Sequence, residues 1–397
     1  MASAAILILT LCFASYLAFS KRLRNSSDWA ATVSPLASIM GSGFLISAPL
    51  LANIVGIYSV FFMGGLLVLA YGVGGAIRFN IRNFEPIENA GMGPAQVLAL
   101  TSRIILSVAY FISISYYLQL LAAFSLHFFD VSEPAIANLV TSALLILIAG
   151  IGIWKGLGRL EKIERYVVAL NIGMVGALIC GLVAYNTGAL FQGKWSLPDV
   201  DNSIDFTDLR ILLGLLIVVQ GFETSRYLGE AHSQDQRIKT MKYAQLISAV
   251  IYLLFIGFST LLFHSGLGAD VTAIIVMTAP VAALLPILLS VAAIGSQFSA
   301  AVADTSGAGG LLGDLSKGKL TEKSCYVLIL AITLGLTWVS DVNEIISYAS
   351  RAFAAYYFLQ CLVAFRVARE QKKSGAGLYA FLGVVCLAVT VLGLPSE

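Results

Sequence analysis

The sequence is poor in charge and has no grouping of metal-binding side chains. Charged residues make up 12% of the 397 residues, hydrophobic residues make up 58%, and the mean hydropathy is +0.88. So little charge excludes a soluble monomer, and the net charge of +2 gives nucleic acid no strongly basic surface. The three histidines are scattered and the five cysteines lie in apolar runs without metal spacing. Because the His, Asp and Glu cluster of an intramembrane enzyme is also missing, we expect no enzyme.

Apolar runs of about 20 residues fill the chain and predict membrane-spanning helices. The short alternating segments of a membrane barrel do not occur in the sequence. We count about 12 spans: a leading helix within residues 1–28, ten core helices, and a last helix within residues 374–397. We expect core helix 5 from Tyr166 to Tyr185, core helix 10 from Ile345 to Phe365, and a short surface helix in the connection leading to Pro286. We therefore predict an all-α membrane protein with a single transmembrane domain over residues 1–397.

The 24 lysine and arginine residues predict the orientation of the chain. If the spans alternate from an outside N-terminus, most of these residues fall in cytoplasmic loops, whereas Lys194 falls in an outside loop. The positive-inside rule then predicts a plasma (inner) membrane protein whose N-terminus lies outside. Core helices 1–5, residues 29–186, enter from the cytoplasm, and core helices 6–10, residues 208–366, enter from outside. Such an arrangement is a five-plus-five inverted repeat.

Two core helices carry glycines in the middle of an apolar run. In core helix 1, Gly41 and Gly43 flank Ser42, although each glycine costs about 1 kcal/mol of helix propensity relative to alanine. Residues 220–225 form a similar interruption in core helix 6. Close helix packing would explain one such site about as well as a break does. Breaks at corresponding places of two repeats, however, indicate a transporter binding site.

Each predicted break supplies polar groups to a ligand. The break in core helix 1 exposes N–H groups at the start of a half-helix, whose positive dipole end favours a substrate carboxylate. In core helix 6, Glu223 either accepts hydrogen bonds from the broken backbone, which we favour, or carries a proton. Phe222 would be a hydrophobic gate or pocket wall. The predicted substrate site consists of Ser38, Gly41, Ser42, Gly43, Phe44, Tyr110, Gln220, Phe222, Glu223 and Thr224.

Core helix 8 carries a second membrane carboxylate, Asp304, among apolar and small residues. It needs a bound cation, a proton, or an arginine such as Arg103 or Arg351 on another helix. We favour cation or proton coupling over a structural ion pair, because intramembrane carboxylates mark ion pathways. Asp304, Thr305 and the carbonyls of core helix 1 would supply the oxygen ligands of a hard cation.

These motifs resemble the amino acid, polyamine and organocation (APC) superfamily of transporters. Residues 39–45, Ile-Met-Gly-Ser-Gly-Phe-Leu, resemble its glycine-rich first helix. Residues 221–223, Gly-Phe-Glu, with the downstream Gly-Glu at 229–230, resemble its sixth-helix signature. The resemblance covers residues 29–366 and implies the five-plus-five inverted-repeat fold with broken helices 1 and 6.

The resemblance also implies a sodium site between core helices 1 and 8. Sodium-coupled members carry a small residue, two spacers and two hydroxyl residues, which would fall here on Ala301, Asp304 and Thr305. The carbonyls of Ala37 and Met40 would face them. Asp304 replaces the first hydroxyl with a carboxylate, which leaves Na+ and H+ both open as the coupling ion. The leading helix is similar to the sodium:solute symporter branch.

We therefore expect a cation-coupled secondary active transporter of a small solute, first of all an amino acid. Helices 1, 2, 6 and 7 would rock against the rest, as the resemblance implies. The alternatives are a carrier of a sugar, nucleobase or amine, or a substrate-sensing receptor on a transporter fold, although we expect no soluble output domain. We expect no cofactor apart from Na+ or H+, and as partners a small-molecule substrate and membrane lipid but no nucleic acid. The sequence leaves the oligomeric state open.

Overall fold

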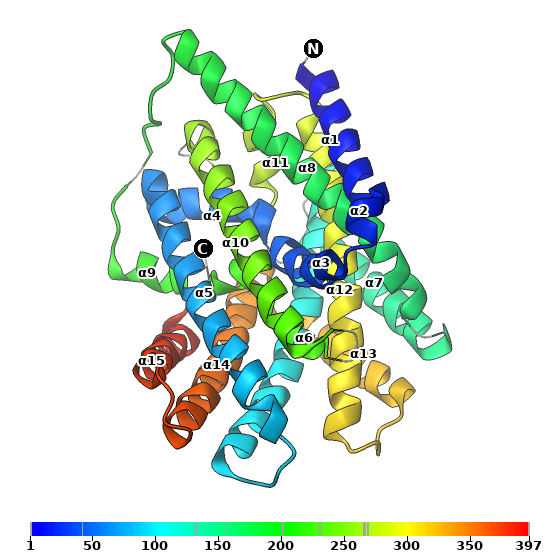
Figure 1. Cartoon of the computed structure of the whole chain (residues 1–397). Helices are drawn as coiled ribbons and strands as arrows, with labels where there is room; N and C mark the ends of the chain where they lie inside the picture. Colours follow the sequence, from blue (N-terminus) through cyan, green and yellow to red (C-terminus); the bar gives the residue numbers. More distant parts are fainter. Residues whose placement is uncertain are drawn as a thin grey trace.

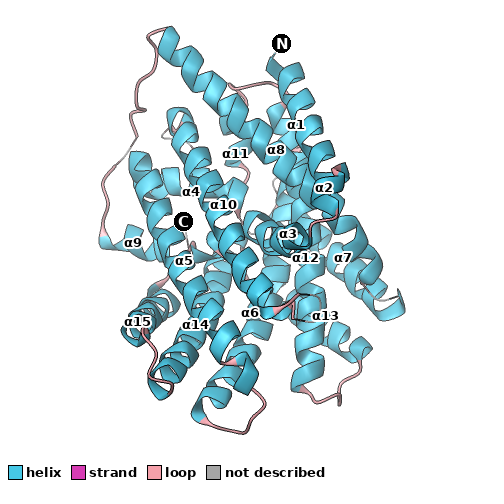
Figure 2. Ribbon diagram, viewed as in Figure 1, coloured by secondary structure: helices cyan, strands magenta, loops and turns pink. Residues whose placement is uncertain are grey.

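The structure is a computed structural model that describes residues 2–41, 43–131, 133–155, 157–200, 202–229, 232–264, 267 and 270–395. Helices and their connecting loops make up this part of the chain, and it contains no strand (Figure 2). Within it, eight helical segments are long and apolar enough to cross a membrane, and Ala376–Leu392 is a shorter apolar helix. The protein is therefore an all-α integral membrane protein, as the sequence predicts.

The first repeat begins with an interrupted helix, which confirms the predicted break in core helix 1. Its two halves are α3 (Ser27–Gly41) and α4 (Phe44–Val55). A short turn, η1 (Gly56–Tyr58), leads into the second helix of the repeat. The remaining helices are α5 (Ser59–Asn83), α6 (Pro94–His127), α7 (Pro134–Lys155) and α8 (Gly158–Phe191), with η2 (Glu85–Ile87) between α5 and α6.

The second repeat also begins with an interrupted helix. Core helix 6 consists of α9 (Phe206–Leu213), η3 (Leu216–Val219) and η4 (Phe222–Tyr227). The predicted break at Gln220 and Gly221 is confirmed. The segments on either side of it, η3 and η4, are 3-10 rather than α-helical, and a turn separates α9 from η3. The other elements are α10 (Gln234–Ser259), η5 (Thr260–Leu262), α11 (Ala273–Thr278), α12 (Leu285–Leu315), α13 (Glu322–Val339) and α14 (Val342–Glu370).

Two helices lie outside the repeats. The leading helix α1 (Ala2–Phe19) packs along α8 and joins α3 through the short α2 (Lys21–Arg24) (Figure 1). The last helix α15 (Ala376–Leu392) packs beside α14. The order of the helices, with core helices 1 and 6 interrupted, agrees with the arrangement that the sequence motifs imply.

Several boundaries differ from the sequence prediction. Helix α8 begins at Gly158 rather than Tyr166, because its charged first part consists mostly of good helix formers. Helix α14 continues past Phe365 to Glu370, where Arg366 and Glu370 form an i,i+4 ion pair at 3.1 Å. The short helix α11, expected on the surface, is largely buried because its residues are mostly apolar.

The core helices pack in two groups, with the interrupted helices between them. Helix α6 packs on α12 and α14, and α12 also packs on α8. Helix α10 packs on α3 and α5, and η4 contacts both α3 and α10. The first half of core helix 1 and the last part of core helix 6 therefore face the α6, α8 and α12 group across the middle of the molecule.

Candidate functional site

The two interrupted helices meet at their breaks. Gly43 lies against η3, where a Cβ on Gly43 would be 2.8 Å from Val218 Cγ1. Gly221 has a φ of +114°, and a Cβ there would be 2.5 Å from Ser38 Oγ and 2.7 Å from Ile39 N. Position 43 requires glycine because there is no room for a Cβ. Position 221 requires it for the same reason and because of its positive φ. Each break thus fills the space beside the other.

Tyr252 of α10 lies beside the carbonyls that both breaks release. Its hydroxyl is 3.1 Å from Ile39 O and also forms a hydrogen bond with Val218 O. The ring packs on Phe44, with centroids 5.2 Å apart. A hydroxyl has one proton to donate, so the two carbonyls share it. Sequence analysis missed this residue; a tyrosine in an apolar helix is itself the signal, because a buried hydroxyl usually finds a partner.

Glu223 accepts a hydrogen bond from the backbone beside its own break. The side chain is 1% exposed, and Oε2 accepts from Gly221 N at 2.9 Å and from Tyr357 OH at 2.7 Å. Phe222 stacks on Tyr357, with ring centroids 5.1 Å apart. Gln220 Nε2 donates to Tyr117 OH at 3.0 Å. The contact that the structural interpretation of Glu223 requires is present, whereas proton carriage stays a prediction.

A polar cavity of about 320 Å³ lies between α3, η4, α6, α8 and α12. Its lining brings together five of the residues predicted from the sequence, from four different helical segments: Ala37, Ser38, Tyr110, Thr224 and Asp304. It also contains polar residues that the sequence analysis did not select: Ser34, Asn171, Tyr227, Ser296, Ser299 and Ser306. Asn171 Nδ2 donates to Ser296 Oγ at 3.1 Å, which joins α8 to α12 on the cavity wall.

The other predicted site residues surround the break and are not among the described lining residues of the cavity. Ser42 lies outside the residues that the structure describes. Phe44 is 1% exposed and packs on Phe255, with centroids 4.4 Å apart, so its ring lies in the core. Gly41 O accepts a hydrogen bond from Gln297 Nε2 at 3.2 Å. The remaining members of this group are Met40, Gly43, Gln220, Phe222, Glu223, Ala301 and Thr305.

Asp304 is the carboxylate of the cavity, and it is 8% exposed. The hydroxyl of Ser113 on α6 forms a hydrogen bond with its Oδ2. The two arginines considered as counter-charges contact other groups: Arg103 pairs with Glu88 at 2.9 Å, and Arg351 Nε donates to Thr390 O at 2.8 Å. These contacts do not test the coupling of Asp304 to a cation or a proton, which stays a prediction.

Of the predicted cation ligands, Ala37 and Asp304 line the cavity, whereas Met40 of α3 and Ala301 and Thr305 of α12 are not among its described lining residues. Thr305 Oγ1 donates to Ala301 O at 2.6 Å, so its proton is engaged within the helix while its lone pairs stay available. Within the described ranges, no three His, Cys, Asp or Glu side chains are placed to hold a metal ion together.

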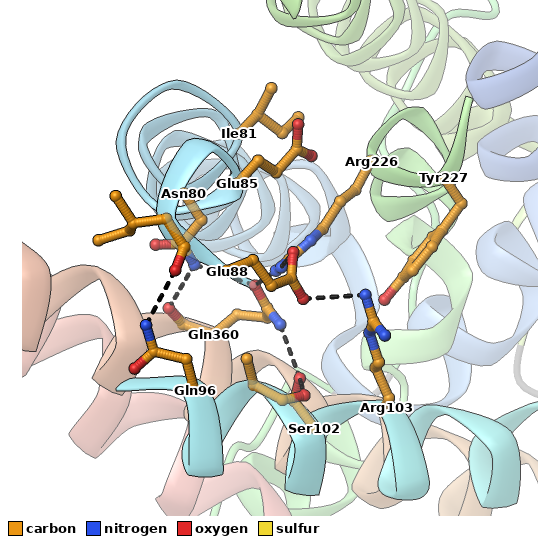
Figure 3. A network of polar contacts seen from close by, with 12 residues as sticks. Asn80, Ile81, Glu85, Glu88, Gln96, Ser102, Arg103, Arg226, Tyr227 and Gln360 are labelled. Atoms are coloured by element: carbon orange, nitrogen blue, oxygen red, sulfur yellow. Dashed lines mark hydrogen bonds and ion pairs between the residues drawn. The ribbon is translucent and has the colours of Figure 1, made fainter. Parts of the chain in front are cut away.

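A network of charged and amide side chains lies beyond the cavity, next to η4 (Figure 3). Glu88, which follows α5, contacts Arg103 of α6 at 2.9 Å and Arg226 of η4 at 3.5 Å. Arg226 also forms a hydrogen bond with Gln360 of α14, whose Nε2 donates to Ser102 Oγ of α6 at 2.8 Å. This network joins η4, which packs on α3 and α10, to the group formed by α6 and α14.

Comparison with known proteins points to one family. A family model described as APC superfamily transporter matches residues 21–393. The chain is also similar to an uncharacterized protein of Aquifex aeolicus (strain VF5), with 39% identity over 370 residues. That match covers 91% of this chain and 89% of the relative. The family match spans all ten core helices and the connections between them.

Proposed function

Because this chain belongs to the APC superfamily of transporters, we propose that it is a cation-coupled symporter of a small solute that bears an amino group, first of all an amino acid. The observation that carries the proposal is the polar cavity between the interrupted helices. Among its described lining residues, Asp304 is the only charged side chain. A carboxylate in a site of low dielectric favours a positively charged partner, either an ammonium group or a coupling ion.

The cavity supplies polar groups from several helices, and these could orient a small solute. Its volume of about 320 Å³ suits a small molecule. In our proposal Asp304 and the hydroxyls of Ser38 and Tyr110 receive the amino group. The carboxylate of an amino acid would extend toward the start of α4, where unpaired N–H groups and the helix dipole favour an anion.

The same carboxylate would couple transport to an ion. Ala37 carbonyl, Asp304 and Thr305 would offer oxygen ligands to Na+, or Asp304 would carry H+. In the orientation that the positive-inside rule predicts, Ser34 and Tyr227 lie on the cytoplasmic half of the cavity. Movement of α3, α5, α10 and η4 against the other group would then open and close the site, and we place the protein in the plasma (inner) membrane with its N-terminus outside.

A second candidate substrate is an amine without a carboxylate. The observation in its favour is separate: no lysine or arginine occurs among the described residues of the cavity wall. A free amine needs only Asp304, whereas an amino acid also needs the anion-binding end of α4. Testing each amino acid against the amine that lacks its carboxyl group therefore distinguishes the two candidates.

The test is a ligand screen on purified protein, followed by uptake into proteoliposomes. Amino acids, their decarboxylated amines, sugars and nucleobases are compared with and without Na+ at two pH values. We expect compounds with an amino group to raise the unfolding temperature and to be accumulated in an ion-dependent way. Asp304→Asn should remove that ion dependence, whereas Asp314→Asn, the same change on an exposed part of α12, should keep it. A folded Asp304→Asn protein with unchanged ion dependence would refute the coupling assignment.

A further inference from the structure

A second cavity, of about 200 Å³, lies between the leading helix, α3 and α8. Its described lining consists of apolar side chains and one tryptophan, Trp29, and includes Leu17 of α1, Val33 of α3 and Ala169 of α8. None of these described lining residues carries a charge or a hydroxyl group. An apolar space of this kind does not retain water, because water needs two or more polar partners there.

Two basic residues adjoin this apolar cavity. Lys21 and Arg22 lie on α2, between the lining residues Ala18 and Leu23, and both are exposed. Trp29 follows at the start of α3. Lysine, arginine and tryptophan beside the end of a membrane span mark the boundary between the hydrocarbon and the headgroups. The cavity therefore lies directly on the hydrocarbon side of a positively charged membrane interface.

We propose that this cavity holds an acyl chain of an anionic phospholipid, whose headgroup lies at Lys21 and Arg22. The apolar wall selects a hydrocarbon chain, and filling the space restores dispersion contacts that an empty void lacks. The exposed basic pair selects a negative headgroup over a zwitterionic one. Charge complementarity and the apolar lining thus point to one occupant, a lipid such as phosphatidylglycerol.

The proposed lipid would lie next to the polar cavity, because the two cavities share part of their walls. Val168 and Ile172 of α8 line both cavities, so these side chains separate the acyl chain from the polar cavity. The interrupted helix α3 contributes to both walls as well, with Val33 on the lipid side and Ser34 on the polar side. An acyl chain at this site would support the wall against which α3 must move. The proposal itself does not depend on the identity of the solute.

Trp29 provides a direct measure of occupancy, because it is one of only four tryptophans in the sequence. Trp154, Trp195 and Trp338 are changed to phenylalanine, and the Trp29-only protein is titrated in detergent micelles with lipids brominated along their chains. We expect brominated phosphatidylglycerol to quench Trp29 at a several-fold lower mole fraction than brominated phosphatidylcholine. Equal titration curves for the two lipids would overturn the proposal.

Separate variants test the headgroup site and the acyl-chain site, beginning with the headgroup. Lys21→Gln with Arg22→Gln should abolish the preference for phosphatidylglycerol, whereas Lys372→Gln with Lys373→Gln, an exposed basic pair after α14, should keep it. Loss of the preference in both double variants would show only general charge attraction and would overturn the specific site.

Substitutions that fill the apolar cavity test whether it holds an acyl chain. Val33→Phe should reduce the quenching by both lipids, and Ala169→Phe, which fills the cavity from α8, provides a second test if the first variant does not fold. Undiminished quenching of Trp29 in a folded variant would show that the acyl chain does not occupy the cavity and would overturn the proposal. No solute is needed in these measurements, so their failure would leave the proposed transport function untouched.

Discussion

The contact between the two breaks predicts a large effect of replacing Gly221 with alanine. Its φ of +114° is a conformation that costs a residue with a Cβ about 1–2 kcal/mol. The added Cβ would also lie 2.7 Å from Ile39 N, a backbone atom that cannot turn away as a side chain can. Overpacking of this kind costs about 1–3 kcal/mol. We therefore expect Gly221→Ala to lose about 2–5 kcal/mol of stability.

The assay is thermal unfolding of the purified protein in detergent, followed by intrinsic fluorescence. Gly64→Ala and Gly65→Ala are matched controls, since an added Cβ at either position has no neighbouring heavy atom within 4 Å. Both lie within α5, where alanine is favoured over glycine by up to about 1 kcal/mol. We expect the controls to unfold at or above the wild-type temperature and Gly221→Ala several degrees below it. If Gly221→Ala unfolds with the controls, the packing of the two breaks described above is wrong.

Three further substitutions test the polar contacts around the breaks in the same unfolding assay. Glu223→Gln should cost about 1–3 kcal/mol, because a neutral acceptor binds Gly221 N and Tyr357 OH more weakly than a carboxylate does; an unchanged midpoint would contradict the structural role. Tyr252→Phe should cost about 1–3 kcal/mol, since it removes the hydroxyl that contacts two buried carbonyls, and wild-type stability would count against this contact. Glu88→Gln should also cost about 1–3 kcal/mol by removing the carboxylate shared by two arginines, and a double-mutant cycle with Arg226→Gln that gives no coupling would count against that contact.

The helices and the two breaks could be predicted from the sequence because their signals are local. Long apolar runs give the spans, and the glycines at 43 and 221 mark the places where core helices 1 and 6 meet. Of the predicted site, Ala37, Ser38, Tyr110, Thr224 and Asp304 share one cavity, since the repeat topology already brings their helices together.

The contacts between side chains could not be predicted, because spacing along one helix does not specify the partner on another. Asp304 contacts Ser113 of α6, and Phe44 packs on Phe255 of α10. Tyr252 and Asn171 carried no motif at all. The 3-10 form of η4 was also missed, because it depends on the tertiary contacts of Gly221 rather than on local helix propensity.

The mutual fit of the two breaks has a mechanical consequence. Gly43 rests on Val218, and Gly221 rests on Ser38, so each half of the sequence closes the gap in the other. A tilt of either half-segment about its midpoint must displace the opposing one, because neither contact leaves room for independent rotation. In the transport cycle proposed above, the two breaks would therefore act as a single joint, which would keep the closing of one face synchronous with the opening of the other.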